Sequence, residues 1–247
     1  MTDNSLSLTH IAAQLEALEE TIIMRFLDRA QFAVNREAYL PGRSGFEGAG
    51  QESLFELRLA AQERMDAEFG RFMVPEERPV SETLPEPRRK VHLPDLPIRV
   101  SDPDVVRRSP AIRDAYLTMI PSLCDNDDDG QYGSAVEHDV YTIQAIGRRV
   151  HYGALYVAEA KYRERTDEYR EAARSGDRER LLSMLTRTTV EARILERLEK
   201  KVRDLQVDVN TEVRRVIGPD VIVSFYRDTI IPLTKSGQIS YLLERAR

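Results

Sequence analysis

Two long helical segments constrain the fold more than any other feature of this sequence. A helix is expected over residues 133–163, and it is the longest that the chain predicts. Over residues 8–31, apolar side chains recur at the three- and four-residue spacings of an amphipathic helix, namely Ile11, Leu15, Leu18, Ile22, Phe26 and Ala30. No internal repeat and no credible strand pair accompany these segments. We therefore expect an all-α, single-domain multi-helix bundle with a long central helix.

Further helices are expected over residues 51–69, 109–123, 167–175, 177–186, 188–206 and 235–246. Ser109–Pro110 is typical of a helix start, with the serine as N-cap and the proline in the first turn. Gly-Pro-Asp at residues 218–220 opens another helix, which we expect Pro232 to interrupt.

Proline is concentrated in one part of the chain. Eight of the twelve prolines lie between Pro75 and Pro110, which predicts an extended connector there because proline disrupts helices. Neither flanking part alone obviously closes a core, so residues 1–247 are expected to form one domain with residues 75–110 as an internal connector. The basic run at residues 88–90 inside it is expected to be solvated.

Composition argues against several classes of protein. The net charge of −6 does not indicate a nucleic-acid partner. No apolar run reaches membrane-spanning length and the N-terminus lacks the form of a signal peptide, so no membrane partner is expected. The one cysteine, Cys124, cannot support a disulfide framework, which favours a reducing compartment. A cytoplasmic location follows as the expectation.

Sequence motifs for metal or nucleophile chemistry are incomplete. Asp125–Gly130 begins like a calcium loop, but the twelfth position is Val136 and Glu137 comes one residue late. We interpret this stretch as a solvated acidic turn, with calcium binding as the alternative. The four histidines have no metal-ligand spacing, and Cys124 has no basic neighbour in the sequence. No metal and no cofactor are therefore expected.

Several polar residues instead fall on otherwise apolar helical faces: Arg149, Lys161, Glu191, Thr234, Lys235 and Gln238. A buried charge is unfavourable unless it is paired. Structural ion pairs and a ligand site explain such residues equally well from this pattern alone.

Ordered segments along nearly the whole chain resemble one known family, the eukaryotic-type, all-helical chorismate mutases of yeast and plants. The segments are LEETIIMRFLDRAQF (18–32), GRFMVPEE (70–77), DDGQYGSA (128–135), RRVHYG (148–153), VAEAKY (157–162), TVEARILERLEKK (189–201), IIPLTK (230–235) and YLLER (241–245). The resemblance implies a homodimeric isomerase that converts chorismate to prephenate in phenylalanine and tyrosine biosynthesis. That pericyclic reaction needs no cofactor. It needs the substrate held in a folded conformation and donors placed where charge develops on the ether oxygen.

The resemblance also implies roles for individual residues. Arg149 would bind one carboxylate, Lys161 would donate to the ether oxygen, and Glu191 would hold the ring hydroxyl. Thr234 would assist at a carboxylate. Gln238 stands where the fungal pattern has a glutamate that must be protonated to donate. Because an amide donates at any pH, we predict no loss of rate between acidic and neutral pH from this position.

Three departures from the family pattern bear on activity. Ala12 stands where the family has a carboxylate-binding arginine, and Arg187 stands where it has asparagine. Arg187, one turn before Glu191, could supply the lost contact or merely pair with Glu191. The third departure is one extra residue in HYGALYVAEAK, residues 151–161, where the family has HYGKFVAEAK.

The extra residue changes the angle between Arg149 and Lys161. At about 100° per residue, eleven steps leave two side chains within about 20° of each other, whereas twelve steps separate them by about 120°. Either the site is disrupted, or a π-bulge absorbs the added residue. We expect the bulge, near Gly153–Tyr156, where glycine eases the distortion.

The eukaryotic enzymes also bind aromatic amino acids at a dimer-interface site. Arg71, Gly133 and Ser134 match part of that pattern, whereas Glu137 replaces a threonine of the regulated fungal form. The alternative is that Gly133 and Ser134 simply start the long helix. Two other functions stay open: a catalytically impaired homologue acting as a regulatory, effector-binding subunit, and a mutase-fold enzyme for a related enolpyruvyl substrate.

Overall fold

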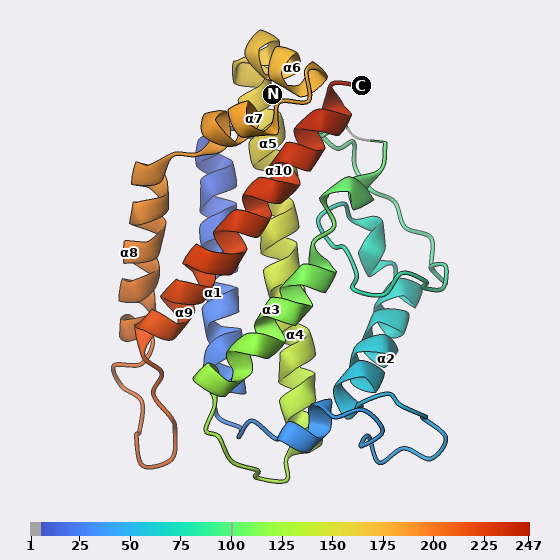
Figure 1. The fold of residues 1–247 in the computed structure, drawn as a ribbon, viewed down its shortest axis with the longest axis vertical. Helices are drawn as coiled ribbons and strands as arrows, with labels where there is room; N and C mark the ends of the chain where they lie inside the picture. The colour runs from blue at the N-terminus through green and yellow to red at the C-terminus, as the bar shows by residue number, and fades with distance from the viewer. Residues whose placement is uncertain (1–5, 100) are drawn as a thin grey trace.

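The computed structural model describes residues 6–99 and 101–247, and every regular element in these two ranges is helical. Figure 1 shows α1 and α4 running side by side, α9 and α10 crossing them diagonally, and α2 and α8 on opposite sides. The α-helices are α1 Leu8–Arg29, α2 Leu54–Glu68, α3 Ser109–Leu123, α4 Tyr132–Tyr152, α5 Ala158–Glu164, α6 Thr166–Arg174, α7 Arg178–Leu185, α8 Thr188–Asp204, α9 Pro219–Phe225 and α10 Ile231–Arg245. The expected all-α architecture is confirmed.

Local sequence signals set several helix starts. Ser7 caps α1 by accepting a hydrogen bond from the His10 backbone N–H, at 3.1 Å. Ser53 and Glu56 form a reciprocal capping box at the start of α2. These caps satisfy backbone donors that a helix start otherwise leaves without partners.

Two clusters of buried apolar side chains hold the bundle together. The first joins α1 to α2, α3, α4, α8 and α9 through residues such as Phe26, Tyr116 and Ile143. The second joins α5, α6, α7 and α10 around Leu155 and Tyr241. The N-terminal end of α1 reaches the second cluster through Ile11, so α1 and the α4–α5 helix run through both.

The predicted long helix over 133–163 is present with one irregularity. After α4 the chain forms a π turn over Gly153–Val157 and continues as α5. The expectation of a bulge near Gly153–Tyr156 is confirmed.

Two sequence-based expectations about helix boundaries are wrong. Ser109 is not the N-cap of α3 but its first residue, Arg108 being the cap, and the Ser109 hydroxyl donates to the backbone oxygen of Arg78 instead. Pro232 does not interrupt the C-terminal helix, because α9 runs through a second π turn, Tyr226–Ile230, directly into α10. Pro232 lies in the first turn of α10, where the ladder changes step and its missing N–H is tolerated.

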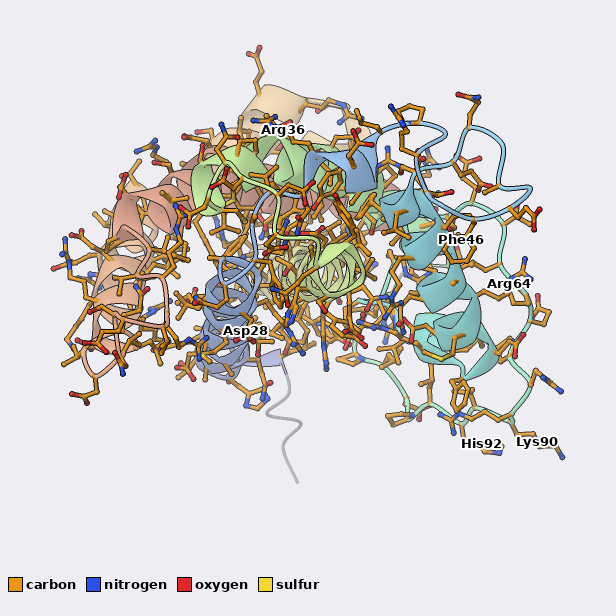
Figure 2. All side chains as sticks on the ribbon, turned by 90° about the horizontal axis from the view of Figure 1, so that it is seen from below. Asp28, Arg36, Phe46, Arg64, Lys90 and His92 are labelled. Carbon is orange, nitrogen blue, oxygen red and sulfur yellow. The ribbon has the colours of Figure 1, made fainter. Side chains whose placement is uncertain are left out.

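The proline-rich stretch is largely irregular, as its proline content predicts. Between residues 75 and 108 it contains only the short 3₁₀ turn Pro103–Val106 within its described part, residues 75–99 and 101–108. The basic run at 88–90 is exposed, and Figure 2 shows Lys90 and His92 at the outer edge beside α2. The assignment of residues 75–110 as a connector within a single domain stays a prediction.

The acidic turn before α4 has a structural role. The Asp129 carboxylate accepts hydrogen bonds from the Ala33 backbone N–H and the Asn35 side-chain amide, each at 2.8 Å. It thereby ties the segment after α1 to the α3–α4 connection. None of the described helices is long and apolar enough to cross a membrane.

Cys124 has a basic neighbour that the sequence did not reveal. The Arg29 guanidinium donates to its Sγ at 3.1 Å, within the core. Burial nevertheless raises the pKa of the Cys124 thiol to about 11, so it stays protonated at neutral pH.

Candidate active site

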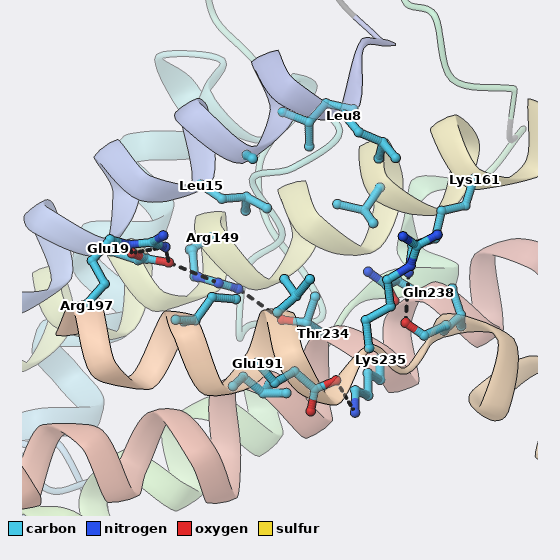
Figure 3. A pocket seen from close by; sticks show the side chains of 18 residues that line it. Leu8, Leu15, Glu19, Arg149, Lys161, Glu191, Arg197, Thr234, Lys235 and Gln238 are labelled. Atoms are coloured by element: carbon cyan, nitrogen blue, oxygen red, sulfur yellow. Dashed lines mark hydrogen bonds and ion pairs between the residues drawn. The ribbon is translucent and has the colours of Figure 1, made fainter. Parts of the chain in front are cut away.

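A cavity of about 320 Å³ opens between α1, α4, α5, α8 and α10 (Figure 3). All the residues to which the sequence assigned a place in a substrate site line it: Arg149, Lys161, Arg187, Glu191, Thr234 and Gln238. Apolar side chains such as Leu15, Ile194 and Ile231 form much of its wall. A cavity of this kind, apolar with a few convergent polar groups, is typical of a small-molecule site.

The π turn brings Arg149 and Lys161 to the same cavity. They are twelve residues apart, and a regular helix would separate their directions by about 120°. The turn Gly153–Val157 closes with wider hydrogen bonds and absorbs the extra residue. Both side chains therefore line the cavity despite the insertion, as Figure 3 shows.

Arg149 is held at one end of the cavity by several contacts. Its Nη1 donates to the Thr234 hydroxyl at 3.4 Å, and its Nη2 lies 3.6 Å from Glu19 Oε1. Its guanidinium carbon lies 5.7 Å from the centroid of the Tyr226 ring. Within the described residues its buried Nε has no hydrogen-bond partner.

Glu19 and Arg197 also line the cavity, although no sequence motif pointed to them. The Arg197 guanidinium forms a bidentate fork with the buried Glu19 carboxylate. Its Nη2 donates to Oε1 at 2.9 Å, and its Nε donates to Oε2 at 3.1 Å. This fork holds the carboxylate that faces Arg149. The available signal was position: Glu19 follows Leu15 by four residues on the apolar face of α1, and Arg197 follows Ile194 by three on α8.

Lys161 occupies another part of the cavity, where its Nζ donates to the backbone oxygen of Leu185 at 2.8 Å. Burial, and then the positive charge of Arg187, lowers the pKa of Lys161 to about 8. Lys161 and Arg187 thus concentrate positive charge in one region.

Glu191 pairs with Lys235 rather than with Arg187. The Lys235 Nζ lies 2.8 Å from Glu191 Oε1. Over residues 6–99 and 101–247, Arg187 forms no ion pair, so the alternative in which it merely neutralises Glu191 is not what the structure shows. Ala12 lines the same cavity, at the position where the family resemblance implies a missing arginine.

Thr234 and Gln238 are fixed on α10 by backbone contacts. The Thr234 hydroxyl donates to the Ile230 oxygen at 2.7 Å, and the Gln238 amide donates to the Gly153 oxygen at 3.1 Å. Both side chains are buried, one turn apart on one helix face.

The three residues matched to an effector site are not brought together within one chain. Arg71 donates to Asp66, Glu77 and Gln144. Gly133 and Ser134 lie in the first turn of α4, whose N-cap is Gln131. Ser134 precedes Gln144 by ten residues, about 15 Å of helix.

Comparisons with known proteins extend over nearly the whole chain. A chorismate mutase 1 of Zea mays is 36% identical over 252 residues, covering 97% of this chain and 79% of the relative. The chorismate mutase of Saccharomyces cerevisiae is 32% identical over 248 residues, covering 97% of this chain and 95% of the relative. A scan against family models found no match.

Solved structures show the same fold. A Candida albicans chorismate mutase in complex with L-Trp superposes with a TM-score of 0.89 and 28% identity, over 98% of this chain and 93% of that one. The chloroplast chorismate mutase of Zea mays gives a TM-score of 0.83 and 33% identity, over 100% and 99%. Identity above 30% along essentially the whole length, with the fold and cavity just described, places this chain in the chorismate mutase family.

Proposed function

We propose that this protein converts chorismate to prephenate in the cavity lined by Arg149 and Lys161. One observation carries the proposal: the π turn returns these two cations to one cavity with Glu191, Thr234 and Gln238. Their convergence in one largely apolar cavity supports catalysis over a silent, purely regulatory homologue.

Each polar group has a task in the rearrangement. Arg149, steadied by Glu19 and Thr234, binds one carboxylate and holds the enolpyruvyl arm over the ring. Lys161 and Gln238 donate to the ether oxygen, on which negative charge grows as its bond to carbon breaks. Glu191, paired with Lys235, accepts a hydrogen bond from the ring hydroxyl. No proton transfer and no covalent intermediate are required.

Arg187 supplies the second carboxylate contact. It replaces the family arginine at whose position this chain has Ala12. Both residues line the cavity, and Arg187 approaches from the start of α8 rather than from α1. Its positive charge lowers the pKa of Lys161, which places the two cations within electrostatic reach of each other. A substrate with two carboxylates can place one beside Arg149 and the other beside Lys161 and Arg187. Each carboxylate then offsets the positive charge next to it.

The direct test is the loss of chorismate absorbance with purified protein, with prephenate identified as the product. Arg149→Ala and Lys161→Ala should each lower kcat/KM by at least about 100-fold, because each removes a charged contact to the transition state. Absence of turnover at high protein concentration would exclude the mutase proposal and leave the effector-binding homologue. If the protein turned over a different enolpyruvyl compound and not chorismate, that result would favour a mutase-fold enzyme for a related enolpyruvyl substrate.

Homodimer formation and effector binding are part of the proposal. Exposed apolar side chains cluster at the end of α2 and in the turn after it, at Met65, Phe69 and Met73, as a subunit interface requires. Two solved structures named AtCM1, each 33% identical to this chain with a TM-score of 0.85, have tyrosine and phenylalanine, respectively, bound in an allosteric site. In this protein Arg71 of one copy and Ser134 of another would have to meet across an interface to form such a site.

The oligomeric state and the effector can be tested together. Light scattering should give a dimer, and titration with tryptophan, tyrosine and phenylalanine should change kcat/KM for chorismate.

A cytoplasmic location is likewise proposed for this chain, although the maize relative is named as chloroplastic.

A further inference from the structure

Gln238 makes a contact that substrate binding does not by itself explain. Its side-chain Nε2 donates to the backbone oxygen of Gly153 at 3.1 Å, and the side chain is only 6% exposed. A primary amide nitrogen carries two hydrogens. One of them is used by this carbonyl, and the other is available to the cavity that Gln238 lines.

The contact depends on a close approach between α10 and the π turn. A Cβ added to Gly237 would lie 2.6 Å from the Ala154 Cβ, and one added to Gly153 would lie 2.9 Å from the Thr234 Cγ2. Glycine at both positions lets the two backbones pack against each other. The Gln238 side chain can then reach across to the turn.

The acceptor belongs to the segment where the chain carries its extra residue. Gly153 is the first residue of the π turn, in which the helical hydrogen-bond ladder changes its step. Such turns are frequent at functional sites. Here the turn both returns Lys161 to the cavity and presents a carbonyl to residue 238.

An amide and a carboxyl group behave differently beside this carbonyl. A protonated carboxyl has one hydrogen, which it can give either to the Gly153 oxygen or to a ligand. An ionised carboxylate has none, and its lone pairs would face those of the carbonyl. Only the amide can satisfy the carbonyl and a ligand oxygen at the same time.

We propose that the Gly153 carbonyl is a positioning group for Gln238: it takes one amide hydrogen and thereby directs the other to the ether oxygen of the ligand. The identity of that ligand atom rests on the proposed function. The inserted residue and the amide then act as one unit, in which the π turn fixes the donor before the ligand arrives.

The charged groups around residue 238 determine which measurement is decisive. The groups lining the same cavity are the cations Arg149, Lys161, Arg187, Arg197 and Lys235 and the carboxylates Glu19 and Glu191. Together they would set the pH at which an introduced carboxyl ionises. The decisive quantity is therefore kcat on the acidic plateau, where that carboxyl is protonated.

The first experiment compares Gln238→Glu with the wild type between about pH 5 and pH 8. On the acidic plateau the variant should remain about tenfold below the wild-type kcat, because one hydrogen must serve two acceptors. The matched control is Gln14→Glu, an exposed position on α1, which should follow the wild-type profile. Full recovery of the variant to the wild-type kcat at low pH would overturn the proposal.

The second experiment needs no turnover. In ligand-free ¹⁵N-labelled protein, the Gln238 side-chain amide is assigned by its loss in Gln238→Leu, and hydrogen exchange is followed. One of its hydrogens should exchange at least about tenfold more slowly than those of Gln14, because it is buried and hydrogen-bonded. Equal exchange rates would refute the hydrogen bond between Gln238 and the Gly153 oxygen. If Gln238→Glu reaches no acidic plateau in kcat, this exchange measurement alone decides whether the proposal stands. A wild type without mutase activity would instead refute the proposed function and leave this readout intact.

Discussion

Single buried polar residues define the site in this protein. Arg149 and Gln238 are almost fully buried, yet both line the cavity. Their fixed partners, Glu19 and the Gly153 oxygen, hold them in place before any ligand binds. Preorganised donors of this kind are more effective than donors that must reorient during the reaction.

Arg187 offers a test of compensation at one residue. Arg187→Asn should lower kcat/KM by about 10- to 100-fold, because it removes a charge-assisted contact to a carboxylate. The double variant Ala12→Arg/Arg187→Asn restores the family arrangement and should recover much of that loss. An Arg187→Asn variant with the wild-type kcat/KM would show that Arg187 does not contact substrate.

Lys161 should give the reaction a basic limit. Burial and Arg187 lower the pKa of its ammonium group to about 8, so the cation that donates to the ether oxygen is present below that pH and lost above it. The logarithm of kcat/KM should therefore fall as the pH rises through about 8. In Arg187→Asn the fall should move to a higher pH, since one of the charges that opposes protonation is gone. A flat profile up to about pH 10 would contradict this assignment.

At the scale of the element, the π turn is the decisive local structure. It keeps α4 and α5 continuous as one helix, while it rotates the side-chain directions of α5, including that of Lys161, relative to Arg149. Gly153 is needed because α10 packs directly against it. The sequence supplied the reason to expect the turn, since family-like segments precede and follow one added residue.

Gly153→Ala tests that packing. The added methyl group would lie 2.9 Å from the Thr234 Cγ2, so Thr234 and its contact with Arg149 must shift. We expect a loss of about 10- to 100-fold in kcat/KM with little loss of helix content by circular dichroism. Gly147→Ala is the control, because its Cβ meets only ordinary contacts at 3.7 Å or more. Equal activity of the two variants would show that the close approach does not matter.

At the scale of the whole molecule, a buried polar network joins helices that are distant in sequence. Asp139 of α4 accepts hydrogen bonds from Arg29 of α1 at 2.7 Å, from Tyr39 at 2.6 Å and from Tyr116 of α3 at 2.8 Å. None of these residues lines the cavity. The network therefore stabilises the fold and not the site itself.

Asp139→Asn should lower the free energy of unfolding by about 3–5 kcal/mol, because it leaves the Arg29 charge buried without its counterion. Asp228→Asn removes an exposed partner of Arg227 and should cost less than about 1 kcal/mol. Urea unfolding measures both values, and kcat of the folded Asp139 variant should stay near the wild type. A cost below about 1 kcal/mol for Asp139→Asn would show that the network contributes little.

The sequence alone determined the helical class, the irregular proline-rich stretch and the choice of candidate residues, because these depend on local periodicity, proline content and short motifs. It did not determine Glu19 and Arg197, the pairing of Glu191 with Lys235, or the contact between Gln238 and Gly153. Those depend on how α1, α8 and α10 pack around the π turn, across as many as 178 residues of chain. A pattern can state which faces of a helix are polar, but only the tertiary packing decides which charges meet and which remain free for a ligand.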